Sequence, residues 1–305
     1  MRRSPLVSLV FFASSSVAVD DWARLPMHST REETKISKKA ALRQMRNLLL
    51  ASLLAILITC PWANAQVQGL QQVAQLPPEL PQRVSGFAYD GEKLWAAIYQ
   101  GQGLYATLDP TTLNWQIRKD AKARQAISEV SGAFHSPGAL CFANGKLWIG
   151  GSYGDSFGSI DIREWTIEST FKGKQRQDSA SQSYAGMAFD GNYLWIAWHW
   201  FKYKLPAAET QVLLKVEPAT GKVVREYPLP PGTRNDMTHG LTFDGSMLWH
   251  AKDNKLTAID PATGVVTTEY TLNQIKRISG LAWDGRSLWI AEFDGKIWRL
   301  PFRMG

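Results

Sequence analysis

Cysteine is scarce in this sequence, with only Cys60 and Cys141 among 305 residues. Cys60 lies in a segment that we expect to be removed, which leaves Cys141 alone and excludes an internal disulfide from the remaining chain. The apolar run Leu48–Thr59 is too short for a transmembrane helix, which needs about 20 residues. We therefore expect a core held together by packing alone and no stable insertion into a membrane.

Recognisable catalytic motifs are also missing. The sequence has no phosphate loop, dinucleotide fingerprint, C-x-x-C or H-E-x-x-H, and its histidines show no metal-ligand spacing. Residues Gly154–Gly158 spell G-x-S-x-G, but they fall in a loop between antiparallel strands, whereas a nucleophile elbow requires a strand-to-helix turn. We predict no cofactor and no resident metal ligand set.

A secretory signal is the first feature that is present. Met45-Arg46-Asn47 gives a basic start, Leu48–Thr59 an apolar run, and Ala63-Asn64-Ala65 a cleavage site before Gln66. We expect residues 45–65 to be the signal peptide, residues 1–44 to be an upstream extension from a mis-assigned start, and residues 66–305 to form one domain. The predicted location is periplasmic or secreted.

The positive charge is concentrated in the segment that we expect to be lost. The whole chain carries +7, but its first 65 residues hold nine Lys/Arg and four Asp/Glu, which leaves +2 for the rest. So small a net charge gives no support to nucleic-acid binding.

A repeat dominates the remaining chain. Each copy has an apolar strand, a turn with Asp-Gly or Asn-Gly, and then a Leu-Trp pair, and the five Leu-Trp tryptophans are 53, 47, 54 and 40 residues apart. The copies begin at Ser85-Gly86, Pro137-Gly138, Ala185-Gly186, His239-Gly240 and Ser279-Gly280, and their tryptophans are Trp95, Trp148, Trp195, Trp249 and Trp289.

Each copy is typical of a four-stranded meander. Asp-Gly and Asn-Gly favour tight hairpins, and a second turn follows the third strand, as in Asp260-Pro261-Ala262-Thr263-Gly264. Four short strands per repeat of about 40 to 50 residues are the signature of a propeller blade. We predict an all-β fold, a five-bladed β-propeller of antiparallel sheets. The fifth copy lacks a fourth strand, and we expect Val67–Leu76, the mature N-terminal strand, to supply it.

The long insertions all fall on one rim of the predicted propeller, around the mouth of its channel: Asp120–Ser136, Lys172–Ser183, His199–Thr210 and Pro228–Thr238. Longer loops on one rim only are typical of a binding face, although such loops can also be merely tolerated there. His239 stands out because other copies have a small residue or proline there. The predicted ligand-binding residues are Tyr99, His135, Tyr153, Trp198, His199, Trp200, Tyr203, His239 and Asp253.

Several of these residues have a purely structural alternative. The aromatic stretch Trp198–Tyr203 fits packing between blades as well as ligand contact. We interpret the Leu-Trp tryptophans as core wedges and Cys141 as an inert buried thiol. A structural divalent cation in the channel, bound by some of Asp236, Asp253, Asp294 and Glu292, is a weaker alternative.

The repeat Ser279–Gly285 with Leu288-Trp289-Ile290-Ala291 resembles bacterial exported YncE-like propellers and the plant-type glutaminyl cyclotransferase family. The second resemblance implies conversion of an N-terminal glutamine to pyroglutamate with a carboxylic acid as proton carrier. That family has a glutamate just after the aromatic residue of the second strand, whereas this sequence has Ala96 there. Candidate replacements for that acid are Glu129, Glu292 and Asp236.

The sequence therefore leaves two hypotheses. The first is a non-enzymatic binding module that engages a peptide, glycan or protein at the long-loop rim. The second is a glutaminyl cyclotransferase-like enzyme, and general acid–base catalysis, worth about 10²- to 10⁴-fold in such chemistry, would need a well-placed carboxyl group.

Overall fold

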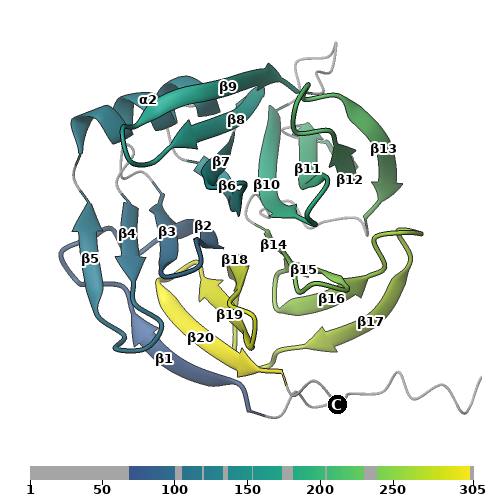
Figure 1. Ribbon diagram of the computed structural model, residues 1–305. Helices are drawn as coiled ribbons and strands as arrows, with labels where there is room; N and C mark the ends of the chain where they lie inside the picture. Colours follow the sequence, from purple (N-terminus) through teal and green to yellow (C-terminus); the bar gives the residue numbers. More distant parts are fainter. Residues whose placement is uncertain are drawn as a thin grey trace, which may run out of the picture. The chain divides into compact units, whose positions relative to one another are not determined.

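The computed structural model describes residues 69–99, 105–118, 120–132, 137–152, 154–173, 181–202, 205–229 and 239–302; of residues 181, 201, 202 and 205–210 only the backbone is described. Within these ranges, five antiparallel sheets of four strands form a five-bladed β-propeller, which confirms the predicted fold. Figure 1 shows the sheets arranged around a central axis. No helix in the described part is long and apolar enough to cross a membrane.

Each blade runs outward from the axis. Blade 1 contains β2 (Val84–Tyr89), β3 (Leu94–Ile98), β4 (Tyr105–Leu108) and β5 (Trp115–Arg118). Blade 2 contains β6 (Pro137–Ala143), β7 (Lys146–Gly151), β8 (Ser156–Asp161) and β9 (Thr166–Lys172). Blade 3 contains β10 (Ser181–Phe189), β11 (Leu194–Lys202), β12 (Leu205–Val216) and β13 (Val223–Pro228).

The other two blades follow the same order, except for the last strand. Blade 4 contains β14 (Gly240–Phe243), β15 (Leu248–Lys252), β16 (Lys255–Ile259) and β17 (Val266–Thr271). Blade 5 contains β18 (Ile278–Trp283), β19 (Ser287–Glu292), β20 (Lys296–Pro301) and β1 (Gln71–Gln75). β1 lies within the predicted segment Val67–Leu76 and pairs antiparallel with β20. That it is the mature N-terminal strand stays a prediction.

The core lies in five seams, each between the faces of two neighbouring blades. The Leu-Trp tryptophans are at most 7% exposed, and each packs toward the next blade while its leucine neighbour packs toward the preceding one. The interpretation of these tryptophans as core wedges is confirmed. A seam is named below by its two blades, as in seam 3/4.

The Asp-Gly turns contribute a recurring hydrogen-bond pattern. In blades 1, 3, 4 and 5 the aspartate accepts the indole N–H of the tryptophan five residues later, at 2.6–2.8 Å, and its other oxygen accepts two backbone N–H groups of the turn. Burial raises the pKa of Asp244, but the donors around it outweigh that effect and hold the pKa below its ordinary value. Each of these turns is thus hydrogen-bonded to the buried tryptophan of its own blade.

Blade 2 departs from this pattern. Its strand pairing also shows that the alignment of its repeat copy with the others was wrong by one residue. Strand register makes Gly138, not Pro137, the equivalent of Ser85, and Ala143 takes the place of the aspartate. Asn144 and Gly145 both have positive φ, 54° and 73°, which defines a two-residue type I′ hairpin. As a result the indole N–H of Trp148 has no hydrogen-bond partner among the described residues.

A helix replaces part of one predicted loop. Residues Ala121–Ser131 form α2, on the periphery beside β8 and β9 (Figure 1). The Asp120 side chain caps it by accepting from two backbone N–H groups, and Gly132 ends it with φ of 59°. Ala123, Ala126, Ile127 and Val130 are buried in seam 1/2 at helical spacing, so this segment is part of the core rather than an open loop.

Candidate functional site

The long-loop rim carries the loops between second and third strands and the connections between blades. One position, four residues after the Leu-Trp tryptophan, directly follows the second strand in four blades and lies within the longer strand β11 in blade 3. We call its five occupants the mouth residues, of which Ser152 and His199 are buried: Tyr99, Ser152, His199, Asp253 and Phe293. All five differ in chemical type. By contrast, the opposite rim repeats nearly the same turn in four of the five blades.

Three histidines meet in seam 3/4. Nδ1 of His239, just before β14, lies 3.1 Å from Nε2 of His250 in β15, at hydrogen-bond distance. The ring centroids of His199 in β11 and His239 are 5.7 Å apart. All three side chains are at most 2% exposed, so blades 3 and 4 bury an imidazole cluster between them.

Burial favours the uncharged form of one ring of this cluster, that of His250. Burial lowers the pKa of His250 from its ordinary value to about 3, and the positive charge of Lys252 acts in the same direction. His250 is therefore neutral at physiological pH. In a neutral pair, one ring donates the hydrogen bond to the other, which fixes the tautomers of both.

A second group of side chains lies at the mouth between blades 5 and 1. The Arg277 guanidinium is 4.1 Å from the ring centroid of Phe293, and that ring is 5.9 Å from the ring of Tyr99. All three side chains are partly exposed. A cation stacked on aromatic rings offers both charge and flat apolar surface to a ligand.

Trp198 and Trp200 do not lie on the surface of the rim. They are 1% and 5% exposed and pack in seam 2/3 with Tyr184, Phe157 and Trp148. Of the two roles that the sequence left open for them, the geometry favours packing between blades.

Of the carboxylates predicted as catalytic, the two that are described, Glu129 and Glu292, lie on separate elements, α2 and β19. Glu129 is exposed on α2, where Gln125 donates to it at 2.8 Å. Glu292 is 1% exposed and accepts hydrogen bonds from the backbone N–H of Lys276, at 2.8 Å, and from the indole of Trp298, at 3.1 Å. Glu292 therefore ties the connection between blades 4 and 5 to its own blade.

Replacing Glu292 with glutamine tests that structural role. The amide oxygen can still accept from Lys276, but its NH₂ group then faces the indole donor, so one buried group loses its partner. We expect a loss of about 1–3 kcal/mol in the free energy of unfolding, measured by urea denaturation. A variant as stable as the parent would show that the hydrogen bond from Trp298 contributes nothing.

The remaining predicted residues have different outcomes. Asp253 adopts a positive φ of 52° in the turn after β15, and its backbone carbonyl accepts from Ile278 at 2.6 Å. His135, Tyr153, Tyr203 and Asp236 lie outside the described residues. Among the residues that are described, no three of His, Cys, Asp and Glu are grouped so that they could hold a metal ion.

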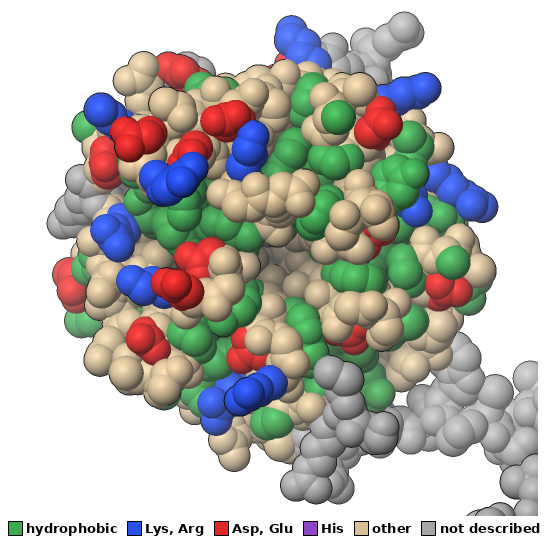
Figure 2. All heavy atoms as spheres, viewed as in Figure 1, with side chains coloured by type: hydrophobic (Ala, Val, Ile, Leu, Met, Phe, Trp, Pro, Cys, Tyr) green, Lys and Arg blue, Asp and Glu red, His purple; other side chains and the backbone are tan. Residues whose placement is uncertain are grey.

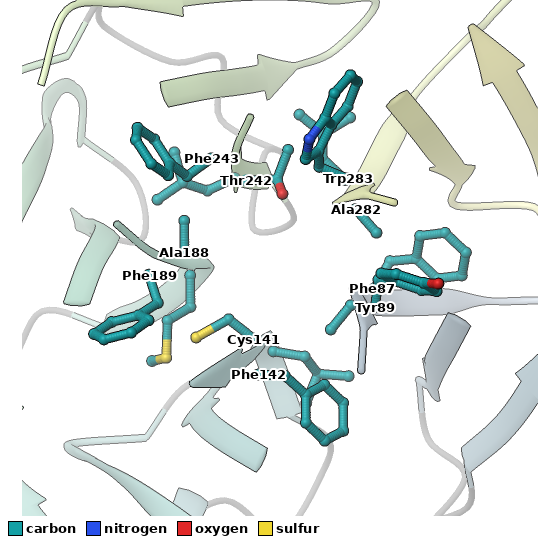
Figure 3. Close-up of a pocket in the computed structure, with 15 residues that line it drawn as sticks. Phe87, Tyr89, Cys141, Phe142, Ala188, Phe189, Thr242, Phe243, Ala282 and Trp283 are labelled. Carbon is teal, nitrogen blue, oxygen red and sulfur yellow. The ribbon is translucent and has the colours of Figure 1, made fainter. Parts of the chain in front are cut away.

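The channel widens into a cavity of about 110 Å³ near the tight-turn rim. Its lining comes from the ends of the five innermost strands, and Figure 3 shows Cys141, Ala188 and Thr242 directed toward its centre with aromatic rings around it. Burial raises the pKa of the Cys141 thiol, which keeps it protonated and unreactive, as predicted. The face in Figure 2 is hollowed at its centre among hydrophobic side chains, and no histidine of the described residues is visible on it.

Sequence reasoning missed His250, Arg277 and Phe293. A signal for His250 was present: the residue directly after the Leu-Trp tryptophan is Ala96, Ile149, Ile196 or Ile290 in the other blades. The comparison between copies that singled out His239 would have found His250 as well. Arg277 and Phe293 gave no such signal, because neither position is repeated elsewhere as a fixed residue type.

The geometry defines the class of this protein as a five-bladed β-propeller. No protein-family model matches the sequence, and no curated protein matches it. Two solved structures of virginiamycin B lyase from Staphylococcus aureus are similar over 77% of this chain and 99% of theirs, at 14% identity. The selenomethionine-substituted enzyme gives a TM-score of 0.41, and a catalytically inactive variant with quinupristin gives 0.40. Values this low carry no argument about activity.

Proposed function

We propose that this chain is an exported, non-enzymatic binding propeller whose ligand, a peptide, glycan or protein, docks on the long-loop rim at the mouth of the channel. One observation carries the proposal: the five mouth residues all differ, while the turns at the opposite rim nearly repeat. In a repeat protein the repeated positions maintain the scaffold, and chemical variety at one end is typical of a binding face.

The partly exposed residues at the mouth suit direct contact with such a ligand. Tyr99, Phe293 and Arg277 present aromatic surface and a cation, and amphipathic side chains of this kind contribute strongly at binding sites. The imidazole cluster is buried between blades 3 and 4, so we assign it a supporting role. Export itself rests on the predicted signal peptide at residues 45–65.

The cyclotransferase alternative has weaker support. Ala96 stands where the resembling family has its glutamate, and its side chain is fully buried in seam 5/1. Glu292 is occupied by two hydrogen bonds, and Glu129 is on the outer helix. Ammonia release from a peptide that begins with glutamine, lost on replacing either glutamate, would contradict a non-enzymatic function.

A matched pair of tyrosines tests the binding site. We would screen short peptides and oligosaccharides by thermal shift against the parent chain, Tyr99→Ala and Tyr89→Ala. Both tyrosines are partly exposed, but Tyr89 is at the opposite rim, next to the Asp90 turn. A compound at 100 times its Kd should stabilise the parent by about 2.7 kcal/mol. We expect Tyr89→Ala to keep the shift and Tyr99→Ala to lose most of it; equal loss in both would place binding elsewhere.

A further inference from the structure

At two positions, seam 3/4 contains residues of a different chemical type from those at the equivalent positions of the other blades. The residue after the Leu-Trp tryptophan packs as alanine or isoleucine in four blades, but it is His250 in blade 4. Likewise His239 occupies the position held by Ser85, Gly138, Ala185 and Ser279 in the other blades. Two titratable side chains therefore replace small or aliphatic ones at the same contact between blades.

Among the described residues, the groups placed beside His250 are neutral or basic. The ring centroid of His239, just before β14, lies 5.3 Å from that of His250 and 5.7 Å from that of His199 in β11. The partners of His250 across the sheet are Leu241 in β14 and the neutral Thr257 in β16, while the charge that acts on it from its own strand is that of Lys252. A proton on His250 would thus lie in a buried seam, beside the imidazole of His239 and near the cation of Lys252.

We propose that seam 3/4 is an acid-sensitive latch: it is closed while its imidazoles are neutral, and protonation of His250 drives the inner strands of blade 4 away from blade 3. This goes beyond the proposed function and does not depend on it, because no ligand is involved. The ring of His239 also contacts that of the mouth residue His199, which links the latch to the mouth.

The direction of the pH effect follows from proton linkage. In the closed seam the pKa of His250 is about 3, below the ordinary 6.5 that it regains in water, so the open state binds more protons between these values. The closed state is fully favoured above about pH 6.5, and its advantage falls by up to about tenfold for each pH unit below that, down to about pH 3.

Hydrogen exchange can locate the opening. Amide exchange of the full chain would be followed by mass spectrometry at pH 6.5 and 4.5, with correction for the intrinsic rates. We expect protection of residues 240–252, which include β14 and β15, to fall by up to about 100-fold. Residues 84–98, the equivalent strands of blade 1, serve as the internal control and should change by less than about threefold.

The matched variant is His250→Ile, which installs the residue that three other blades carry at this position. We expect it to abolish the pH dependence of residues 240–252. Retention of that dependence, or an equal change in both segments of the parent, would overturn the proposal. Should the variant fail to fold, titration of the histidine rings of the parent chain by NMR decides: one ring must stay neutral down to pH 5, and titration of every ring near 6.5 would refute the latch.

Discussion

Replacing Trp198 with alanine should cost about 3–5 kcal/mol of unfolding free energy, the largest loss expected from any single substitution considered for this protein. The indole is 1% exposed and packs in seam 2/3 in one cluster with Trp148 and Tyr184, so its removal leaves a cavity in the seam between the two blades. Guanidinium denaturation followed by tryptophan fluorescence and circular dichroism measures the change.

The control for Trp198→Ala is Tyr99→Ala, a truncation of another large aromatic residue at the rim. Because Tyr99 is partly exposed, we expect it to cost clearly less than Trp198. If Trp198→Ala left stability unchanged and instead abolished ligand capture, the indole would be a binding residue and the described packing would be wrong.

The second large effect is expected for Asp190→Ala. Its carboxylate accepts the indole N–H of Trp195 at 2.8 Å and the backbone N–H groups of Asn192 and Tyr193 at 2.8 and 2.7 Å. Trp195 is fully buried, so the substitution leaves a buried donor without its partner and unties the turn. We expect a loss of about 2–4 kcal/mol, measured by urea denaturation.

Blade 2 supplies the matched comparison for the indole hydrogen bond. Trp195→Phe removes a bonded N–H, whereas Trp148→Phe removes one that has no partner in the described chain. The two substitutions delete the same atoms from equivalent wedges, and we expect Trp195→Phe to cost about 1 kcal/mol more. Equal losses would show that the Asp–Trp hydrogen bond contributes nothing to stability.

The fold could be predicted because its information is local and repeated. Asp-Gly followed by Leu-Trp sets a turn, an indole hydrogen bond and a buried wedge within six residues, so each copy independently indicates the same hairpin. In blade 2 the same reasoning misplaced the first strand by one residue, because Asn144-Gly145 looks like Asp-Gly but stands one residue closer to the Leu-Trp pair. Strand register, not residue identity, resolved that difference.

The rim was harder to predict because its contacts join residues far apart in the chain. The Arg277–Phe293–Tyr99 stack and the His199–His239–His250 cluster each depend on how two blades meet, which no local pattern encodes. α2 was missed for a different reason: its buried residues are alanines, isoleucine and valine, a weak apolar signal between two strong strand patterns.

The five sheets of the described chain form a circle, and this arrangement limits the effect of losing one contact between neighbouring blades. β18 of blade 5 packs against β2 of blade 1, so every sheet in the described chain has two flanking partners and none serves as a terminal cap. Loss of one junction converts the circle into an arc in which each sheet still keeps a companion. One seam can therefore open locally while the molecule stays folded. Complete separation of a sheet requires the seams on both of its sides to open together.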